Sequence, residues 1–291
     1  MRYKVTHTTN YSYTESSPVC HNQVHLTPRD LGHQACAYNR LLIKPQPNIL
    51  DRRIDYFGNH VMNFAIQEPH SKLTVTAVSK VHVAPIAVIE SNQTPPWETV
   101  RDQLRAPHNA RTLDACQFGF DSPHIKMADE LAQYAAVSFT EGRPILAAAL
   151  ELNERIHREF RYDPSATTIS TPLEDVLRLR RGVCQDFAHL EIGCLRSLGL
   201  AARYVSGYLL TTPPPGQPRL IGADASHAWL SVFCGDTSWV DLDPTNSVIP
   251  STAHITLAWG RDYSDVCPIN GVFIGGGQHS MTVWVDVLPL S

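Results

Sequence analysis

The sequence predicts an α+β protein, in which an all-β, sandwich-like domain precedes a core of helices and antiparallel sheet. Three observations support this fold class: short β-type runs fill the first part of the chain, helical periodicity dominates the middle, and strand-type runs return towards the end. A length of 291 residues fits two domains. We expect residues 1–84 to form the β domain, 85–111 a linker and 112–291 the second domain.

The first domain is predicted from alternation with a period of two. Alternate positions from Tyr3 to Tyr13 carry ring or β-branched side chains, and the positions between them are polar, as in a half-buried strand. Turn signals such as Gly58-Asn59 separate further short runs at residues 25–27, 39–43, 60–66 and 73–82. Several short strands with turns between them are typical of a β-sandwich.

The second domain is predicted to begin with helices and to end with strands. Residues 85–111 contain Pro95, Pro96 and Pro107 and little periodicity, which indicates a linker. Cap signals and helical spacing then predict helices at residues 122–136, 144–160 and 171–180. Strand-type runs follow at residues 202–210, 228–234, 238–242 and 281–288.

Charge and cysteine content exclude several classes of protein. The formal net charge is -4 and the basic residues are scattered, so we expect neither nucleic acid nor a membrane surface as a partner. The chain opens on an alternating pattern with no apolar run, and its seven cysteines form no close pairs. We therefore expect a cytoplasmic protein without a disulfide framework, a cofactor or a metal site.

Cys184 is the candidate nucleophile. Residues 187, 190, 194, 195 and 198 recur at helical spacing, which places Cys184 at the start of an amphipathic helix that ends at Gly199. A helix N-terminus favours the thiolate, the reactive form of cysteine. The alternative is an ordinary buried thiol, the interpretation we give to Cys194 on the apolar face.

A base and an acid are predicted from the strands that follow. His227 opens a strand in Ser226-His227-Ala228-Trp229, after a proline- and glycine-rich loop at residues 213–216. Asp241 and Asp243 end the next strand, and adjacent antiparallel strands bring such side chains together. Because both aspartates have the same parity, alternation does not choose between them.

These residues carry a resemblance to a known family. The chain is similar to the transglutaminase-like superfamily, whose core is papain-like, in Gly182-Val183-Cys184-Gln185-Asp186, in Ser226-His227-Ala228-Trp229 and in Asp243-Pro244-Thr245-Asn246. Its first residues, among them His7-Thr8-Thr9-Asn10-Tyr11, resemble the N-terminal domain of a bacterial subfamily. The resemblance implies a triad of Cys184 as nucleophile, His227 as base and Asp243 as orienting acid.

The implied reaction is acyl transfer through a thioester, with hydrolysis of a peptide, protein or small amide as the expected outcome. An oxyanion hole is then required, and Gln185 and Tyr162 are candidates beside the backbone N–H of Cys184. Three alternatives stay open at this point: amine transfer to protein glutamine, an inactive binding or assembly module, and a metal enzyme that uses the same residues. The β domain could select substrate, support the core or join copies into a homo-oligomer.

Overall fold

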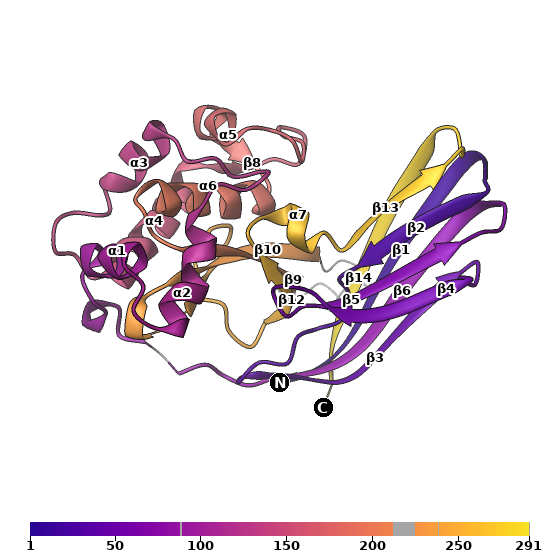
Figure 1. Cartoon of the computed structure of the whole chain (residues 1–291), viewed down its shortest axis with the longest axis horizontal. Coiled ribbons are helices and arrows are strands. Elements are labelled where there is room, and N and C mark those ends of the chain that lie inside the picture. The colour runs from indigo at the N-terminus through magenta and orange to yellow at the C-terminus, as the bar shows by residue number, and fades with distance from the viewer. Residues whose placement is uncertain (88, 212–224, 238, 291) are drawn as a thin grey trace, which may run out of the picture.

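The computed structural model describes residues 1–87, 89–211, 225–237 and 239–290, so the loop expected at residues 213–216 lies outside the described residues. Figure 1 shows two lobes, one rich in helices and one made of strands, with β9, β10 and β12 between them. The strands are β1 (Arg2–Ser17), β2 (Val19–Val24), β3 (Gln34–Lys44), β4 (Ile49–Ile54), β5 (His60–Ile66), β6 (His70–Val83), β7 (Arg161–Tyr162), β8 (Arg181–Gly182), β9 (Ala202–Leu209), β10 (Ala225–Phe233), β11 (Trp239–Leu242), β12 (His254–Gly260), β13 (Ile269–Ile274) and β14 (His279–Leu290). The helices are α1 (Trp97–Arg105), α2 (Ala110–Cys116), α3 (Asp129–Ala136), α4 (Ile145–Glu159), α5 (Leu173–Leu179), α6 (Cys184–Ser197) and α7 (Tyr263–Val266), and the short 3-10 turns are η1 (Ser91–Gln93), η2 (Gln117–Gly119) and η3 (Gly235–Thr237).

The β lobe is built from two antiparallel four-stranded sheets. Their strand orders are β14-β1-β6-β3 and β13-β2-β5-β4. The sheets pack on each other through their inner faces, where the rings of Tyr13 and Phe273 lie 5.1 Å apart. Alternation along β1 explains this packing, because Tyr3, Val5 and Tyr13 share the buried face predicted from the sequence.

The C-terminal strands complete the β lobe, and here the structure differs from the expected domain division. β14 pairs with most of β1, from Arg2 opposite Leu290 to Tyr13 opposite His279, and β13 pairs with β2. Residues 269–290 therefore belong to the sheets of the β lobe instead of closing the second domain. β14 and β13 cover the edges of β1 and β2 that the other strands of the first 84 residues leave open. The exact domain boundaries stay a prediction.

Two other expectations about the middle of the chain need correction. The expected linker, residues 85–111, contains the whole of α1 and the start of α2. Asn109 Oδ1 caps α2 by accepting from the Thr112 backbone N–H at 2.9 Å. α3 begins at Asp129 and not at residue 122. Ser122 does not cap it, since its hydroxyl accepts a hydrogen bond from buried Arg196 at 3.2 Å.

The helical lobe is organised around α6. This helix packs against the sheet with strand order β11-β10-β9-β12, and α3, α4 and α5 cover its other sides. Every residue of α6 from Asp186 to Arg196 is buried. The α+β class predicted from the sequence is confirmed. Within the described residues, no helix combines the length and apolar character needed to span a membrane.

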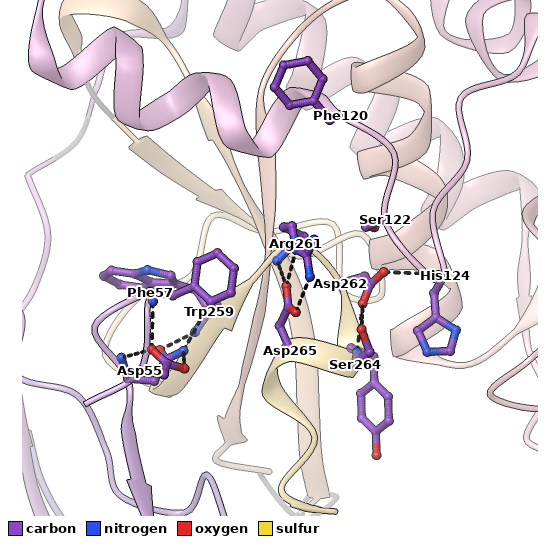
Figure 2. A network of polar contacts seen from close by, with 12 residues as sticks. Asp55, Phe57, Phe120, Ser122, His124, Trp259, Arg261, Asp262, Ser264 and Asp265 are labelled. Carbon is purple, nitrogen blue, oxygen red and sulfur yellow. Dashed lines mark hydrogen bonds and ion pairs between the residues drawn. The ribbon is translucent and has the colours of Figure 1, made fainter. Parts of the chain in front are cut away.

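A polar network fixes the two lobes to each other (Figure 2). Asn59, directly before β5, donates to the Trp259 carbonyl at 2.9 Å and accepts from the Trp259 N–H at 3.0 Å. Its amide also donates to Asp55 at 2.8 Å. Beyond β12, Arg261 and Asp265 form an ion pair with a 2.9 Å contact. The two Asn59 contacts hold the end of β12 against the β lobe, and the Arg261–Asp265 pair braces the segment that follows β12.

Candidate active site

Cys184 is the first residue of α6, and the chain before it is held rigidly. The side chain of Asp186 accepts hydrogen bonds from the Val183 N–H at 2.8 Å and from the Thr167 hydroxyl at 2.6 Å. The hydrogen bond from the Val183 N–H to Asp186 is one half of a capping box at the start of the helix. Glycine at position 182 leaves room for this contact, because a Cβ there would lie 2.6 Å from the Asp186 carboxylate. The half-buried thiol of Cys184 is thus presented at the helix N-terminus, as predicted.

His227 lies on β10 and joins Cys184 to Asp243. Its Nε2 is 2.7 Å from Asp243 Oδ2. Burial alone would lower the pKa of His227, but hydrogen bonds with Asp243 and with Cys184 outweigh burial and raise this pKa to about 10. The imidazole is therefore charged at neutral pH. Since Nε2 faces Asp243, Nδ1 is the ring nitrogen left for the thiol.

Asp243 is a fully buried carboxylate surrounded by donors. Its Oδ2 contacts three side chains: His227 at 2.7 Å, Asn246 at 2.7 Å and His254 at 3.1 Å. Its Oδ1 accepts from the backbone N–H of Thr245 at 3.0 Å and of Asn246 at 3.3 Å. Burial would raise the pKa of Asp243, but the hydrogen bonds from the two histidines hold it well below its usual range. The acid is an anion across the working pH range of proteins.

The choice between Asp241 and Asp243, which parity leaves open, follows from the register of β10 and β11. Leu230 lies opposite Leu242 in this pair of strands. The register sets Asp243 diagonal to His227 and places Asp241 beside Trp229, whose indole N–H donates to Asp241 at 2.9 Å. Asp241 therefore positions the buried Trp229, and Asp243 is the carboxylate that is hydrogen-bonded to His227.

A cavity of about 500 Å³ opens onto these side chains between the two lobes. Cys184, His227 and both oxyanion candidates, Gln185 and Tyr162, line it. Burial raises the pKa of Tyr162, with Cys184 and Asp186 adding to the effect, so its hydroxyl keeps its proton and can donate. Cys194 lies in the core, fully buried, and burial raises the pKa of its thiol, as expected for an inert cysteine.

His254 is a site residue that the sequence did not reveal. It begins β12, is buried, and shares the Asp243 carboxylate with His227. Its Nδ1 has no hydrogen-bond partner among the described residues, so the ring donates through Nε2. One atom each of His227, Asp243 and His254 lies within 4.8 Å of the others. A lone histidine at the start of a strand gives no sequence signal for such a role.

Comparison with known proteins identifies the family of the chain. The bacterial transglutaminase-like N-terminal region matches residues 3–82, and the transglutaminase-like superfamily matches residues 132–244. The uncharacterized protein Rv2569c of Mycobacterium tuberculosis is 41% identical over 296 residues, which cover 99% of this chain and 93% of that protein. The chain belongs to the transglutaminase-like superfamily. The resemblance predicted from the motifs is confirmed.

Two further similarities are to an enzyme with a named activity and to a protein with a crystal structure. A protein-glutamine gamma-glutamyltransferase of Pseudomonas aeruginosa is 30% identical over 132 residues, which cover 43% of this chain and 18% of that enzyme. The crystal structure named "Putative Cysteine Protease from Cytophaga hutchinsonii" superposes with a TM-score of 0.77 and 20% identity, covering 100% of this chain and 92% of the other. At this identity the second similarity establishes the fold of this transglutaminase-like protein, both lobes included.

Proposed function

We propose that this transglutaminase-like protein hydrolyses peptide or amide bonds by thiol-dependent acyl transfer. One observation carries the proposal: Cys184 opens α6 at the cavity, in contact with a histidine whose Nε2 lies 2.7 Å from a buried aspartate. Nucleophile, base and orienting acid in this order are the arrangement that acyl transfer requires. The roles of Cys184, His227 and Asp243 are part of the proposal.

In the first half-reaction the thiolate of Cys184 attacks the carbonyl carbon of the amide. A bond forms between Sγ and carbon, and the carbonyl electron pair moves onto oxygen. When this intermediate collapses, the C–N bond breaks and the imidazolium of His227 gives its proton to the leaving nitrogen. The products are a free amine and a thioester on Cys184.

In the second half-reaction water attacks the thioester carbon and gives a proton to His227. The bond between carbon and Sγ breaks, the carboxylic acid leaves, and the thiolate beside the imidazolium is restored. Asp243 keeps Nε2 as the donor nitrogen and stabilises the charged ring throughout. The other donors to Asp243 hold it in place, because they bind both of its carboxylate oxygens.

Developing charge on the carbonyl oxygen needs placed donors. The backbone N–H of Cys184 is unpaired within the first turn of α6 and is the first donor. The Tyr162 hydroxyl and the Gln185 amide line the same cavity, and either supplies the second. Tyr162→Phe and Gln185→Ala identify which one: its loss lowers kcat by about 10²-fold and leaves KM nearly unchanged.

Hydrolysis and amine transfer differ in the molecule that attacks the thioester. A lysine acceptor arrives as a cation, and the described residues that line the cavity include no aspartate or glutamate to receive it. This favours water. The similarity to a protein-glutamine gamma-glutamyltransferase supports amine transfer as the second candidate.

The test uses peptide and glutamine-amide substrates in H2(18)O, with and without a primary amine, and Cys184→Ala as the blank. Hydrolysis predicts one 18O atom in each new carboxylate and the same product when the amine is present. Preferential formation of the amine adduct would favour transfer. A Cys184→Ala protein as active as the parent would contradict both candidates.

Two non-acyl alternatives have their own tests. A metal-dependent reaction through His227, Asp243 and His254 predicts that 1,10-phenanthroline abolishes activity; we expect no effect, because three donors already occupy Asp243 Oδ2. An inactive binding module predicts that iodoacetamide labels Cys184 no faster than a free thiol. We expect iodoacetamide to label Cys184 faster than a free thiol, and we expect His227→Ala to slow this reaction.

A further inference from the structure

Strands β1 and β14 of the β lobe line part of the cavity that Cys184 also lines. Three cross-strand pairs of β1 and β14 line it, and together they are called the β1/β14 wall here: His7 with Val285, Thr9 with Val283, and Tyr11 with Met281. Alternate residues of a strand share one face, so these six side chains point the same way. They continue the inner face of the sheet beyond the region that the second sheet covers.

The β1/β14 wall is hydrogen-bonded to β9, the strand next to the one that carries His227. The Tyr208 hydroxyl on β9 is 3.0 Å from His7 Nδ1, and His7 Nε2 is 3.1 Å from the Thr9 hydroxyl. Tyr208 lies opposite Ser226, the neighbour of His227, in the pairing of β9 with β10. The wall and the histidine are therefore held at a fixed separation by hydrogen bonds between buried groups.

Side-chain exposure increases along the β1/β14 wall, from a buried end to an exposed apolar end. His7, Thr9 and Val285 are buried, whereas Val283 and Met281 keep 49% and 56% of their surface exposed. These two side chains point into a cavity that also contains the nucleophile, so they are available to a substrate rather than used in packing. Apolar surface of this kind gains free energy when a ligand covers it.

The cavity also contains little charge. Among the described lining residues there is no lysine, arginine, aspartate or glutamate. Burial lowers the pKa of His7 to about 4, so this side chain is neutral at physiological pH. The charge that remains among these side chains is that of the His227 imidazolium. A charged substrate side chain would lose its hydration against the wall without gaining a partner.

From this geometry we propose that the β1/β14 wall binds an uncharged apolar side chain of the acyl donor, in the residue next to the scissile amide. The inference rests on the proposed function, since it names the substrate class of the same site: peptides or peptide-like amides with a bulky apolar residue. Pockets that select by apolar contact discriminate by about 10- to 200-fold. The β lobe is then a specificity element of the enzyme.

The experiment measures inactivation of the full-length protein by three matched affinity labels, the chloromethyl ketones of N-acetyl-Leu, N-acetyl-Glu and N-acetyl-Lys. Each transfers its carbon to Sγ of Cys184 with loss of chloride, so no turnover is needed. Rates are divided by the iodoacetamide rate at Cys184, which depends on thiol reactivity alone. We expect the Leu label to react at least about 10-fold faster than the other two. Equal rates would overturn the inference.

A matched pair of variants on β14 locates the effect. Val283→Asp puts a carboxylate in the wall and is expected to remove the Leu preference and to favour the Lys label. Thr282→Asp puts the same carboxylate on the opposite face of the strand and is expected to keep it. An unchanged preference in Val283→Asp, or an equal loss in both variants, would overturn the inference. If Val283→Asp does not fold, Val283→Ala replaces it, with a reduced Leu preference as the expected result.

Failure of the proposed function is visible separately in the same data. An iodoacetamide rate at Cys184 equal to that of a free thiol, and unaffected by His227→Ala, would contradict the claim that Cys184 is an activated nucleophile. The ratio of Leu to Glu labelling would still report on the wall. A fast iodoacetamide rate with equal labelling by the three ketones would support the activated nucleophile and contradict only the binding role of the β1/β14 wall.

Discussion

The substitution Asp243→Asn removes the charge that stabilises the imidazolium and leaves the size of the side chain unchanged. In the native protein the pKa of His227 rises from 6.5 to about 10, against the effect of burial. One pH unit is worth about 1.4 kcal/mol, so the net shift favours the charged ring by roughly 5 kcal/mol after the cost of burial is subtracted. Without the carboxylate, burial prevails, the pKa of His227 falls, and the ring is neutral at pH 7.

Two consequences of Asp243→Asn differ in size. An ordinary cysteine is only about 3% thiolate at pH 7, so labelling by iodoacetamide can fall by at most about 30-fold. Amide hydrolysis also needs the proton that the imidazolium gives to the leaving nitrogen, and we expect kcat/KM to fall by about 10²- to 10³-fold. Part of the stabilisation comes from Cys184 itself, so the full 5 kcal/mol is not lost.

The assay is iodoacetamide labelling between pH 5 and pH 10, read at the Cys184 peptide by mass spectrometry. The native protein should label rapidly at neutral pH and keep its imidazolium up to pH about 10, where this charge is lost as the pH rises through the folded pKa. Asp243→Asn should instead label at a rate that climbs with pH like a free thiol. Cys267, in the same cavity, is an internal reference, because burial raises the pKa of its thiol.

Asp241→Asn is the matched control for this experiment. It makes the same chemical change on the same face of the sheet, but its carboxylate contacts Trp229 at 2.9 Å and not the histidine. It should cost about 1 kcal/mol of stability and leave Cys184 labelling within about twofold of the native rate. A normal labelling rate in Asp243→Asn, or an equal decrease in both variants, would refute the argument.

Three further substitutions test the structure around the site. His254→Phe removes one donor to Asp243 and should lower the free energy of unfolding by about 1.5–3 kcal/mol in urea titrations; a change below about 0.5 kcal/mol would show that the contact is unimportant. Gly182→Ala drives a Cβ into the Asp186 carboxylate and should cost about 1–3 kcal/mol by thermal unfolding, whereas an unchanged Tm would mean that the helix start adjusts freely. Burial raises the pKa of Glu191 well above its usual value, so the native protein should lose stability relative to Glu191→Gln as pH rises above about 4.5. Parallel pH profiles of the two proteins would contradict a protonated Glu191.

Cys184 could be predicted from the sequence because the signal is local. Helical spacing of apolar residues marks α6, and Gly182 marks the turn before it. The chemistry of a helix N-terminus then follows from backbone geometry alone. The alternating first strand is local in the same way, and its buried face was also predicted correctly.

The rest of the site depends on strand register, which sequence alone does not specify. Asp241 and Asp243 have the same parity, and only the pairing of β10 with β11 assigns one to Trp229 and the other to His227. The motif resemblance chose Asp243, which is the carboxylate that contacts the histidine. His254 was missed because it reaches Asp243 through the pairing of β12 with β9.

The β1/β14 wall could not be predicted for a related reason. The alternation of β14 marks it as a strand, but it does not say which sheet the strand joins. Its partner β1 lies at the other end of the chain, with Tyr11 opposite Met281. Contacts between such distant segments leave no periodic signal along the sequence. The expected division at residue 112 therefore placed the last strands with the wrong lobe.

The central claim is that the acyl group of the substrate is carried by Cys184. Rapid acid quenching during turnover of an N-acetyl-Leu amide, followed by mass spectrometry of the Cys184 peptide, tests it most directly. The account predicts a mass increase equal to the acyl group on Cys184, removed by hydroxylamine and absent in Cys184→Ala. Turnover with no acyl group on this cysteine, or continued turnover in Cys184→Ala, would contradict it.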